Sequence, residues 1–180
     1  MTAKLREKVR RQASGRCEYC RLPERVSPLR FQVDHIIAKK HRGGEALRNL
    51  AWSCADCNAH KGSDLSGIDP DTSRLEHLYN PRIDLWEEHF ICERGEMRGK
   101  TAIGRVTVTL LEMNRPERVA LRFELIASGL LSDETGTDFE RLQRTKETDP
   151  ANSRAAKGRR PSRNWNRRKR ETLEPRTFAA

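Results

Sequence analysis

The sequence predicts a small α+β domain in which two strands and a helix surround a metal site. Two Cys-x-x-Cys pairs lie 33 residues apart. Between them, an alternating apolar and polar segment leads into Asp34-His35, and a second apolar run follows a glycine pair. The second cysteine pair then opens a helix-like stretch. One metal ion could therefore hold both ends of a hairpin that carries polar side chains.

Local patterns predict each element of this domain. A charged helix is expected first and ends at Ser14-Gly15, directly before the first cysteine pair. Leu29 to Val33 alternates as a half-buried strand does, and Leu50 to Ser53 can return beside it. The predicted order is helix, strand, strand, helix, at residues 3–13, 29–33, 50–53 and 55–63.

Beyond residue 66 the sequence predicts an extension of hairpin and helices. The segment 86–97 is typical of a hairpin turning at Arg94-Gly95, and Pro116 and Gly129 punctuate a helix at its start and just past its end. The expected helices are 102–113, 116–127 and a weaker one at 138–146. We divide the chain into a metal-binding domain (1–66), an extension packing on it (67–149) and a tail (150–180).

Positive charge is unevenly distributed along the chain. The formal net charge is +10, and residues 151–180 contribute ten Lys/Arg against two Glu. The other 150 residues hold 26 basic and 24 acidic residues, so we expect the basic character to belong to the tail. The tail has almost no apolar residues to bury, which predicts a disordered arm that contacts nucleic-acid phosphates. A solvated tail with no partner is the alternative.

Composition also limits the class of protein. Apolar residues make up 35% and charged residues 34%, so a large core is not expected and a metal would help to stabilise the fold. No apolar stretch approaches the length of a membrane span, and the first twelve residues are charged, unlike a signal peptide. We expect a cytoplasmic protein with no membrane partner.

Four of the five cysteines are spaced as zinc ligands. Cys17 and Cys20 form one pair, and Cys54 and Cys57 form the other. Such pairs present four thiolates tetrahedrally, which suits one structural Zn²⁺. Two disulfides or free thiols are the alternatives, and a reducing compartment favours zinc. Cys92 lies outside both Cys-x-x-Cys pairs and is expected to be a small buried side chain.

The polar residues between the cysteine pairs suit phosphodiester hydrolysis. His35 can act as a general base because a neutral imidazole titrates near physiological pH. Asp34 and the amide oxygen of Asn58 are ligands of the kind that a hard divalent cation prefers. Asn49 has the donors and the acceptor needed to tie the loop after His35. These residues indicate a nuclease that uses a divalent metal.

The same residues carry a resemblance to a known family. The sequence resembles the HNH endonucleases, whose ββα-metal motif reads Cys-x2-Cys, Asp-His, Asn and Cys-x2-Cys-(His/Asn)-x2-Lys. The matching positions are Cys17, Cys20, Asp34, His35, Asn49, Cys54, Cys57, Asn58 and Lys61. Asn80-Pro-Arg82 and Trp86-Glu-Glu-His-Phe90 are similar to segments that follow the motif in small stand-alone bacterial members.

The resemblance implies a role for each residue. His35 would be the general base, Asn49 would organise the loop, and Asp34 with Asn58 would hold a catalytic Mg²⁺ or Mn²⁺. The chain departs from the pattern where Asn58 replaces a histidine, which favours these hard metals. It departs again at Ala38, where many relatives have proline.

The expected function is hydrolysis of DNA phosphodiester bonds, with RNA as an alternative substrate. A non-catalytic zinc-stapled module that binds nucleic acid, or a subunit that delivers DNA to a partner, is the alternative function. Basic side chains in the motif, the loop and the tail are expected to contact nucleic-acid phosphates. They are Lys61, Lys39, Lys40, Arg42, Arg167, Arg168, Lys169 and Arg170.

Overall fold

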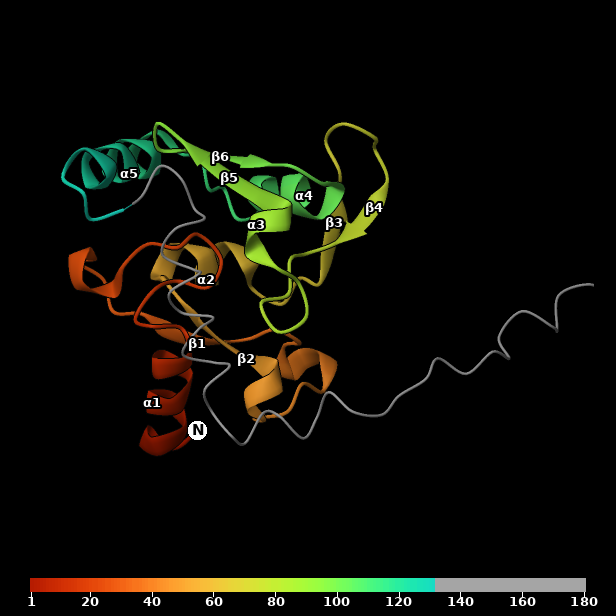
Figure 1. The fold of residues 1–180 in the computed structure, drawn as a ribbon. Coiled ribbons are helices and arrows are strands. Elements are labelled where there is room, and N and C mark those ends of the chain that lie inside the picture. The colour runs from red at the N-terminus through yellow and green to blue at the C-terminus, as the bar shows by residue number, and fades with distance from the viewer. Residues whose placement is uncertain (132–180) are drawn as a thin grey trace, which may run out of the picture. The chain divides into compact units, whose positions relative to one another are not determined.

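The computed structural model describes residues 1–131, which belong to one compact unit (Figure 1). The predicted weaker helix at 138–146 and the basic tail lie outside the described residues. The α+β prediction is confirmed: helices and short two-stranded antiparallel sheets are interleaved along the chain. Within residues 1–131, no helix is long and apolar enough to cross a membrane.

A β-hairpin lies at the centre of the first half of the chain. Strand β1 (Gln32–His35) pairs antiparallel with β2 (Leu50–Ser53), so that His35 stands opposite Leu50. The predicted second strand has the correct bounds. The first strand begins three residues later than predicted, because Leu29 follows Pro28 in an exposed loop. Asp34 and His35 are therefore inside the strand rather than after it.

Two helices pack against this hairpin, as Figure 1 shows. Helix α1 (Ala3–Gln12) begins at Thr2, whose hydroxyl accepts a hydrogen bond from the Leu5 N–H at 3.2 Å, and it packs against β2. Helix α2 (Ala55–Lys61) begins after Cys54 and is capped by Gly62. Its last residue, Lys61, lies two residues before the predicted end at 63. The predicted order of helix, strand, strand and helix is confirmed.

The segment between the motif and residue 86 holds a hairpin that the sequence did not predict. Strands β3 (Ser66–Ile68) and β4 (Leu75–His77) are three residues long, and the apolar side chains of Ile68 and Leu75 are exposed. They show no alternation of buried and exposed residues from which strands could be inferred. Their connecting turn is instead held by Asp69, which accepts two hydrogen bonds from Arg105.

The C-terminal elements follow the prediction with two differences: the helix predicted at 102–113 ends at Leu110, and a helical turn replaces the start of the first strand. Strands β5 (Phe90–Glu93) and β6 (Glu96–Gly99) turn at Arg94-Gly95, followed by α4 (Ala102–Leu110) and α5 (Pro116–Ala127). Residues Trp86–His89 form one helical turn, α3, instead of the start of a strand. This turn buries the Trp86 ring, whose indole N–H donates to the Tyr19 carbonyl at 2.8 Å.

Short 3₁₀ turns complete the described chain. They are η1 (Glu24–Val26), η2 (Lys39–His41) and η3 (Leu47–Asn49). The last two lie in the loop that joins β1 to β2. The core contains the large aromatic side chains from both halves of the chain, as expected for core-filling residues. The buried rings are Tyr19, Phe31, Trp52, Tyr79, Trp86 and Phe90.

Candidate metal centre and active site

The four predicted zinc ligands come together in one buried cluster. The sulfur atoms of Cys17, Cys20, Cys54 and Cys57 all lie within 4.8 Å of one another. The first pair lies on the turn after α1, and the second pair spans the start of α2. None of the four forms a disulfide. The cluster thus joins the two ends of the hairpin segment, as the spacing predicts.

The dimensions of this cluster fit Zn²⁺. The sulfurs of Cys20 and Cys54 are 3.7 Å apart. Four thiolates at about 2.3 Å from a tetrahedral zinc ion lie about 3.8 Å from each other, whereas disulfide sulfurs lie about 2.05 Å apart. Complete burial also suits a closed structural site rather than an open catalytic one. These residues can hold one zinc ion that links α2 to the N-terminal turn.

An arginine from α5 lies against the cysteine cluster. Arg118 donates to the Cys57 sulfur at 3.0 Å and to the Leu111 carbonyl at 2.7 Å, and its side chain is buried. Burial opposes its charge, but the negative charge expected on Cys57 and its neighbours outweighs burial and raises the pKa of Arg118. This contact connects the extension to the zinc ligands, across 61 residues of sequence.

Asn49 ties the loop that follows His35. Its side-chain oxygen accepts a hydrogen bond from the Ile37 N–H at 2.8 Å, and its side-chain nitrogen donates to the Ile37 carbonyl at 3.0 Å and the Gly44 carbonyl at 2.9 Å. Gly43 approaches this network so closely that an added Cβ would lie 1.6 Å from the Ile37 oxygen. The residue at 43 must therefore be glycine for the loop to close in this way.

His35 lies at the end of β1 with its ring half-buried. Its Nε2 atom is buried and has no hydrogen-bond partner among the described residues. Side chains alternate along a strand, so His35 shares a face with Val33, and the residue paired with Val33 is Trp52. The backbone carbonyl of His35 accepts a hydrogen bond from the Lys61 ammonium at 3.1 Å.

Asp34 is on the opposite face of the hairpin, beneath α2. Its carboxylate accepts a hydrogen bond from the Tyr19 hydroxyl at 2.5 Å and lies 3.2 Å from the Lys61 ammonium. All three side chains are buried. Burial, followed by the negative charge of Asp34, raises the pKa of Tyr19 well above its ordinary value, so the phenol remains a donor. Lys61 is thus held inside the domain, a position that does not match the predicted phosphate contact.

Asn58 lies near the same face but is partly exposed. Its side-chain nitrogen donates to the side-chain oxygen of Gln32 at 2.9 Å, so its own side-chain oxygen is not used in this contact. Asp34 and Asn58 are the predicted ligands of a catalytic metal, but the Asp34 charge is already balanced by Lys61. Because Lys61 neutralises Asp34, Asp34 and Asn58 do not form a site for a divalent ion in this arrangement. Within residues 1–131, the four cysteines are the group of three or more His, Cys or acidic side chains that could hold a metal ion.

The residues described above lie in a segment that matches a known protein family. Residues 17–64 match the family model described as HNH endonuclease, a range that begins at the first zinc ligand and includes His35, Asn49 and Asn58. Residues 17–64 are an HNH endonuclease domain.

One curated relative extends the similarity beyond the HNH domain. The Septu protein PtuB of Bacillus thuringiensis is 27% identical over 118 residues, which cover 64% of this chain and 43% of that protein. The chain therefore spans less than half the length of this relative, and the stand-alone character implied by the resemblance stays a prediction. No solved structure matches the chain.

The predicted phosphate-contacting residues of the loop lie on the surface beside the HNH domain's hairpin. Lys39, Lys40 and Arg42 are exposed in and after η2. Lys39 forms an ion pair with Glu45 at 2.8 Å, and the N-terminal ammonium lies 3.3 Å from the same carboxylate. The four predicted contacts in the tail, Arg167, Arg168, Lys169 and Arg170, lie outside the described residues.

Four supporting residues were given no role by sequence reasoning, because each acts across a long sequence separation. Glu18, between the first two zinc ligands, accepts two hydrogen bonds from Arg82 at 2.6 and 2.9 Å, and also one from the Trp52 N–H. Arg82 further donates to the Leu50 carbonyl. The Asn80-Pro-Arg82 segment was a usable signal, since it was noticed as a family feature without a role. Tyr19 and Arg118 gave no signal in the sequence.

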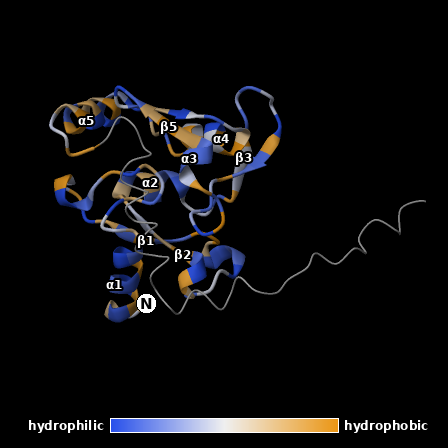
Figure 2. Cartoon of the chain, in the orientation of Figure 1, coloured by the Kyte–Doolittle hydropathy of each residue, from blue (hydrophilic) through white to orange (hydrophobic). Residues whose placement is uncertain are grey.

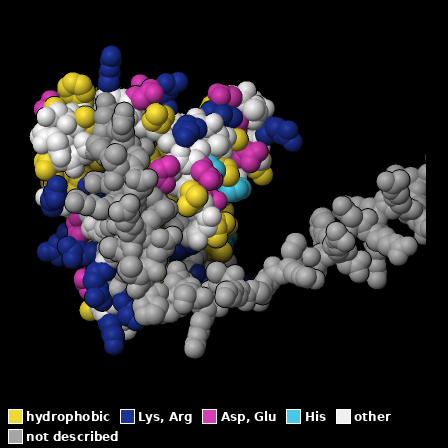
Figure 3. All heavy atoms as spheres, viewed as in Figure 1, with side chains coloured by type: hydrophobic (Ala, Val, Ile, Leu, Met, Phe, Trp, Pro, Cys, Tyr) yellow, Lys and Arg dark blue, Asp and Glu magenta, His cyan; other side chains and the backbone are white. Residues whose placement is uncertain are grey.

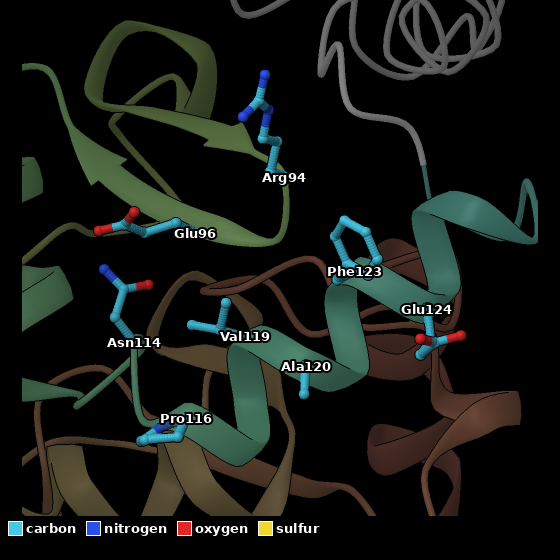
Figure 4. Close-up of a pocket in the computed structure, with 8 residues that line it drawn as sticks. All are labelled: Arg94, Glu96, Asn114, Pro116, Val119, Ala120, Phe123 and Glu124. Carbon is cyan, nitrogen blue, oxygen red and sulfur yellow. The ribbon is translucent and has the colours of Figure 1, made fainter.

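A hollow of about 510 Å³ lies away from these residues (Figure 4). Its lining comes from the β5–β6 turn and from α5, as the labelled side chains in Figure 4 show. It contains none of the predicted site residues of the HNH domain. We assign it no part in the chemistry.

Proposed function

We propose that the HNH domain is a nuclease that hydrolyses phosphodiester bonds in DNA, with His35 as its general base. The observation that carries this proposal is the way the backbone around His35 is held. Lys61 binds the His35 carbonyl at 3.1 Å, and Asn49 binds the Ile37 N–H at 2.8 Å. A general base must be fixed relative to the attacked phosphate, and these contacts supply that rigidity.

The environment of the imidazole suggests which nitrogen acts. Nε2 of His35 is buried, so we propose that Nδ1 is the nitrogen that carries the basic lone pair and meets the incoming water. In the proposed step, Nδ1 takes a proton from water as the water oxygen attacks phosphorus, the P–O3′ bond breaks with its electron pair leaving on O3′, and O3′ gains a proton from solvent water. The products would carry 5′-phosphate and 3′-hydroxyl ends, as the family resemblance implies.

A divalent ion belongs to the proposal through the family rather than through a formed site. Asn58 offers a partly exposed amide, but the Asp34 carboxylate is paired with Lys61 at 3.2 Å. The proposed proton transfer therefore involves His35 and water alone. Cleavage assays in EDTA, Mg²⁺ and Mn²⁺ measure how far the rate depends on these ions.

The Lys61–Asp34 ion pair is also the observation that favours the second candidate function. If Lys61 holds Asp34 permanently, the domain lacks one of the implied metal ligands and could serve as a zinc-stapled module that binds or delivers DNA. This module would bind DNA with equal affinity in the presence and absence of Mg²⁺.

One assay separates these two functions. Supercoiled plasmid is incubated with the purified protein in EDTA, Mg²⁺ or Mn²⁺, and nicked and linear products are separated on a gel. The nuclease proposal predicts nicking with at least one of the two metals. Binding of the plasmid without any cleavage under the three conditions would contradict it and support the non-catalytic module.

A further inference from the structure

The net positive charge of the described residues comes from the first 48 residues of the chain. Residues 1–48 contain thirteen Lys/Arg and five Asp/Glu, a net charge of +8. Residues 49–131 contain ten Lys/Arg and thirteen Asp/Glu, a net charge of −3. The near balance over the first 150 residues therefore conceals a polarised domain, and the expectation that the tail alone is basic was incomplete.

Helix α1 concentrates much of this charge on the surface. Five of its ten residues are Lys or Arg and one is Glu. Lys4, Lys8, Arg10 and Arg11 are exposed, and Figure 3 shows Lys and Arg side chains gathered over this helix. Figure 2 shows the same helix as largely hydrophilic. Val9 is the buried residue of this helix. The other side chains are wholly or partly exposed and can contact solvent or a partner.

Two contacts place α1 beside the hairpin and the loop that follows β1. Arg6 donates to the carbonyl of Phe31, directly before β1, and its guanidinium lies 4.5 Å from the Trp52 ring centre. The N-terminal ammonium is 3.3 Å from Glu45, in the loop that follows β1. The N-terminal end of α1 therefore lies beside the loop that follows His35, and Lys4 is in its first turn.

The cations of α1 divide into two groups. Arg6 and Arg10 are used within the fold, since Arg6 binds Phe31 and Arg10 binds Glu24 at 2.7 Å. Lys4 and Lys8 are exposed, and within residues 1–131 neither forms an ion pair. They are four residues apart and so lie on one face of the helix. Two ammonium groups on one face, with no acidic partner, are suited to a polyanion.

We propose that Lys4 and Lys8 of α1, together with Lys40 and Arg42 beside η2, form a phosphate-binding surface for double-stranded DNA beside the loop that follows His35. This inference rests on the proposed function for its choice of DNA. Exposed lysines attract the regularly spaced phosphates of a duplex without reading bases, and each phosphate contact releases condensed counterions. The surface would hold the duplex on the folded domain itself, independently of the tail.

The test compares two pairs of charge-removing substitutions in the full-length protein. Lys4→Gln/Lys8→Gln removes two charges from α1, and Gln keeps nearly the helix propensity of Lys. Arg74→Gln/Arg98→Gln removes two exposed charges from the acidic half as the control, and of these two Arg98 is paired with Glu93 at 2.7 Å. Both pairs are made in a His35→Ala background without divalent metal. Binding to a short DNA duplex is then followed by fluorescence anisotropy over a series of KCl concentrations.

We expect the slope of log affinity against log salt to fall by about two in the α1 pair, and to be unchanged in the control. Lys4→Arg/Lys8→Arg should restore the wild-type slope. Equal slopes and affinities in the α1 pair, the control and the parent would overturn the surface. Because binding is measured without cleavage, an inactive wild-type protein would contradict the nuclease proposal and leave this result interpretable.

Discussion

The side-chain amide of Asn49 binds both backbone polar groups of Ile37. It accepts from the Ile37 N–H at 2.8 Å and donates to the Ile37 carbonyl at 3.0 Å, in the manner of a paired strand residue. It also donates to Gly44 at 2.9 Å. A single buried side chain therefore fixes both ends of the segment that follows His35, and this segment sets where His35 lies at the protein surface.

This relationship predicts the effect of Asn49→Asp. The carboxylate can still accept from Ile37 N–H but cannot donate to the two carbonyls, which are left without a partner. We expect the free energy of unfolding to fall by about 1–3 kcal/mol. We expect cleavage to fall about 100-fold, because small displacements of a base are costly. Urea unfolding, hydrogen exchange at Ile37 and plasmid nicking measure these effects. Unchanged exchange at Ile37 would contradict the assigned role.

The cysteine cluster predicts one Zn²⁺ per chain and a fold that depends on it. Replacing Cys54 by Ser removes one of the four ligands, so zinc content should fall and thermal unfolding should lose cooperativity. Cys92→Ala is the matched control, because Cys92 is buried but lies outside the cluster, and its zinc content should stay at one. Elemental analysis measures the metal. A zinc-free protein with two disulfides in its mass spectrum would refute the site.

The buried Arg82–Glu18 pair predicts a large stability difference between two arginines. Arg82→Met leaves Glu18 without its partner at 2.6 Å, and we expect unfolding free energy to fall by about 3–5 kcal/mol. Arg98→Met removes an exposed ion pair with Glu93 and should cost no more than about 1 kcal/mol. Chemical denaturation of both variants tests the difference. Similar losses of unfolding free energy in the two variants would show that the contact of Arg82 with Glu18 does not stabilise the fold.

The Asp69–Arg105 contact predicts a loss of stability in acid. Hydrogen bonds from Arg105 lower the pKa of Asp69 below its ordinary value. A carboxylate whose pKa is lower in the folded state stabilises the fold above its unfolded pKa of about 3.9, and this contribution disappears as pH falls through the folded pKa. Asp69→Asn should therefore melt at a lower temperature than wild type at neutral pH, and the difference should begin to shrink below about pH 4 and vanish as the pH falls through the lower folded pKa. Parallel melting curves across this range would contradict the linkage.

Much of the HNH domain could be predicted because its signals are local. Cysteine spacing indicated the cluster, and the position of Asn49 before β2 indicated its role in the loop. The pairing of Asp34 with Lys61 could not be predicted in the same way, since it depends on how α2 packs over β1. Neighbouring residues of a strand point to opposite faces, which separates Asp34 from His35 once both lie in β1, but periodicity does not reveal which carboxylate a distant cation will neutralise.

The extension shows the same limit. The turn at Arg94-Gly95 was predictable because glycine readily adopts the positive φ of a tight hairpin turn, and in the structure both residues have positive φ. The β3–β4 hairpin was not predicted, because its apolar residues are exposed and an ion pair from α4 holds its turn. Charge counted over long windows likewise hid the basic surface of α1, which becomes visible only when Lys4 and Lys8 are placed on one helix face.

The most direct test of the proposed function is plasmid cleavage by His35→Gln beside His41→Gln. Both substitutions remove an imidazole, but His35 ends β1 while His41 is exposed in η2 and contacts the Ser63 carbonyl. We predict that both variants keep zinc and DNA affinity, that His41→Gln nicks plasmid at nearly the wild-type rate, and that His35→Gln loses at least about 100-fold in rate. Wild-type cleavage by His35→Gln, with Mg²⁺ or Mn²⁺ present, would contradict the assignment of His35 as the general base.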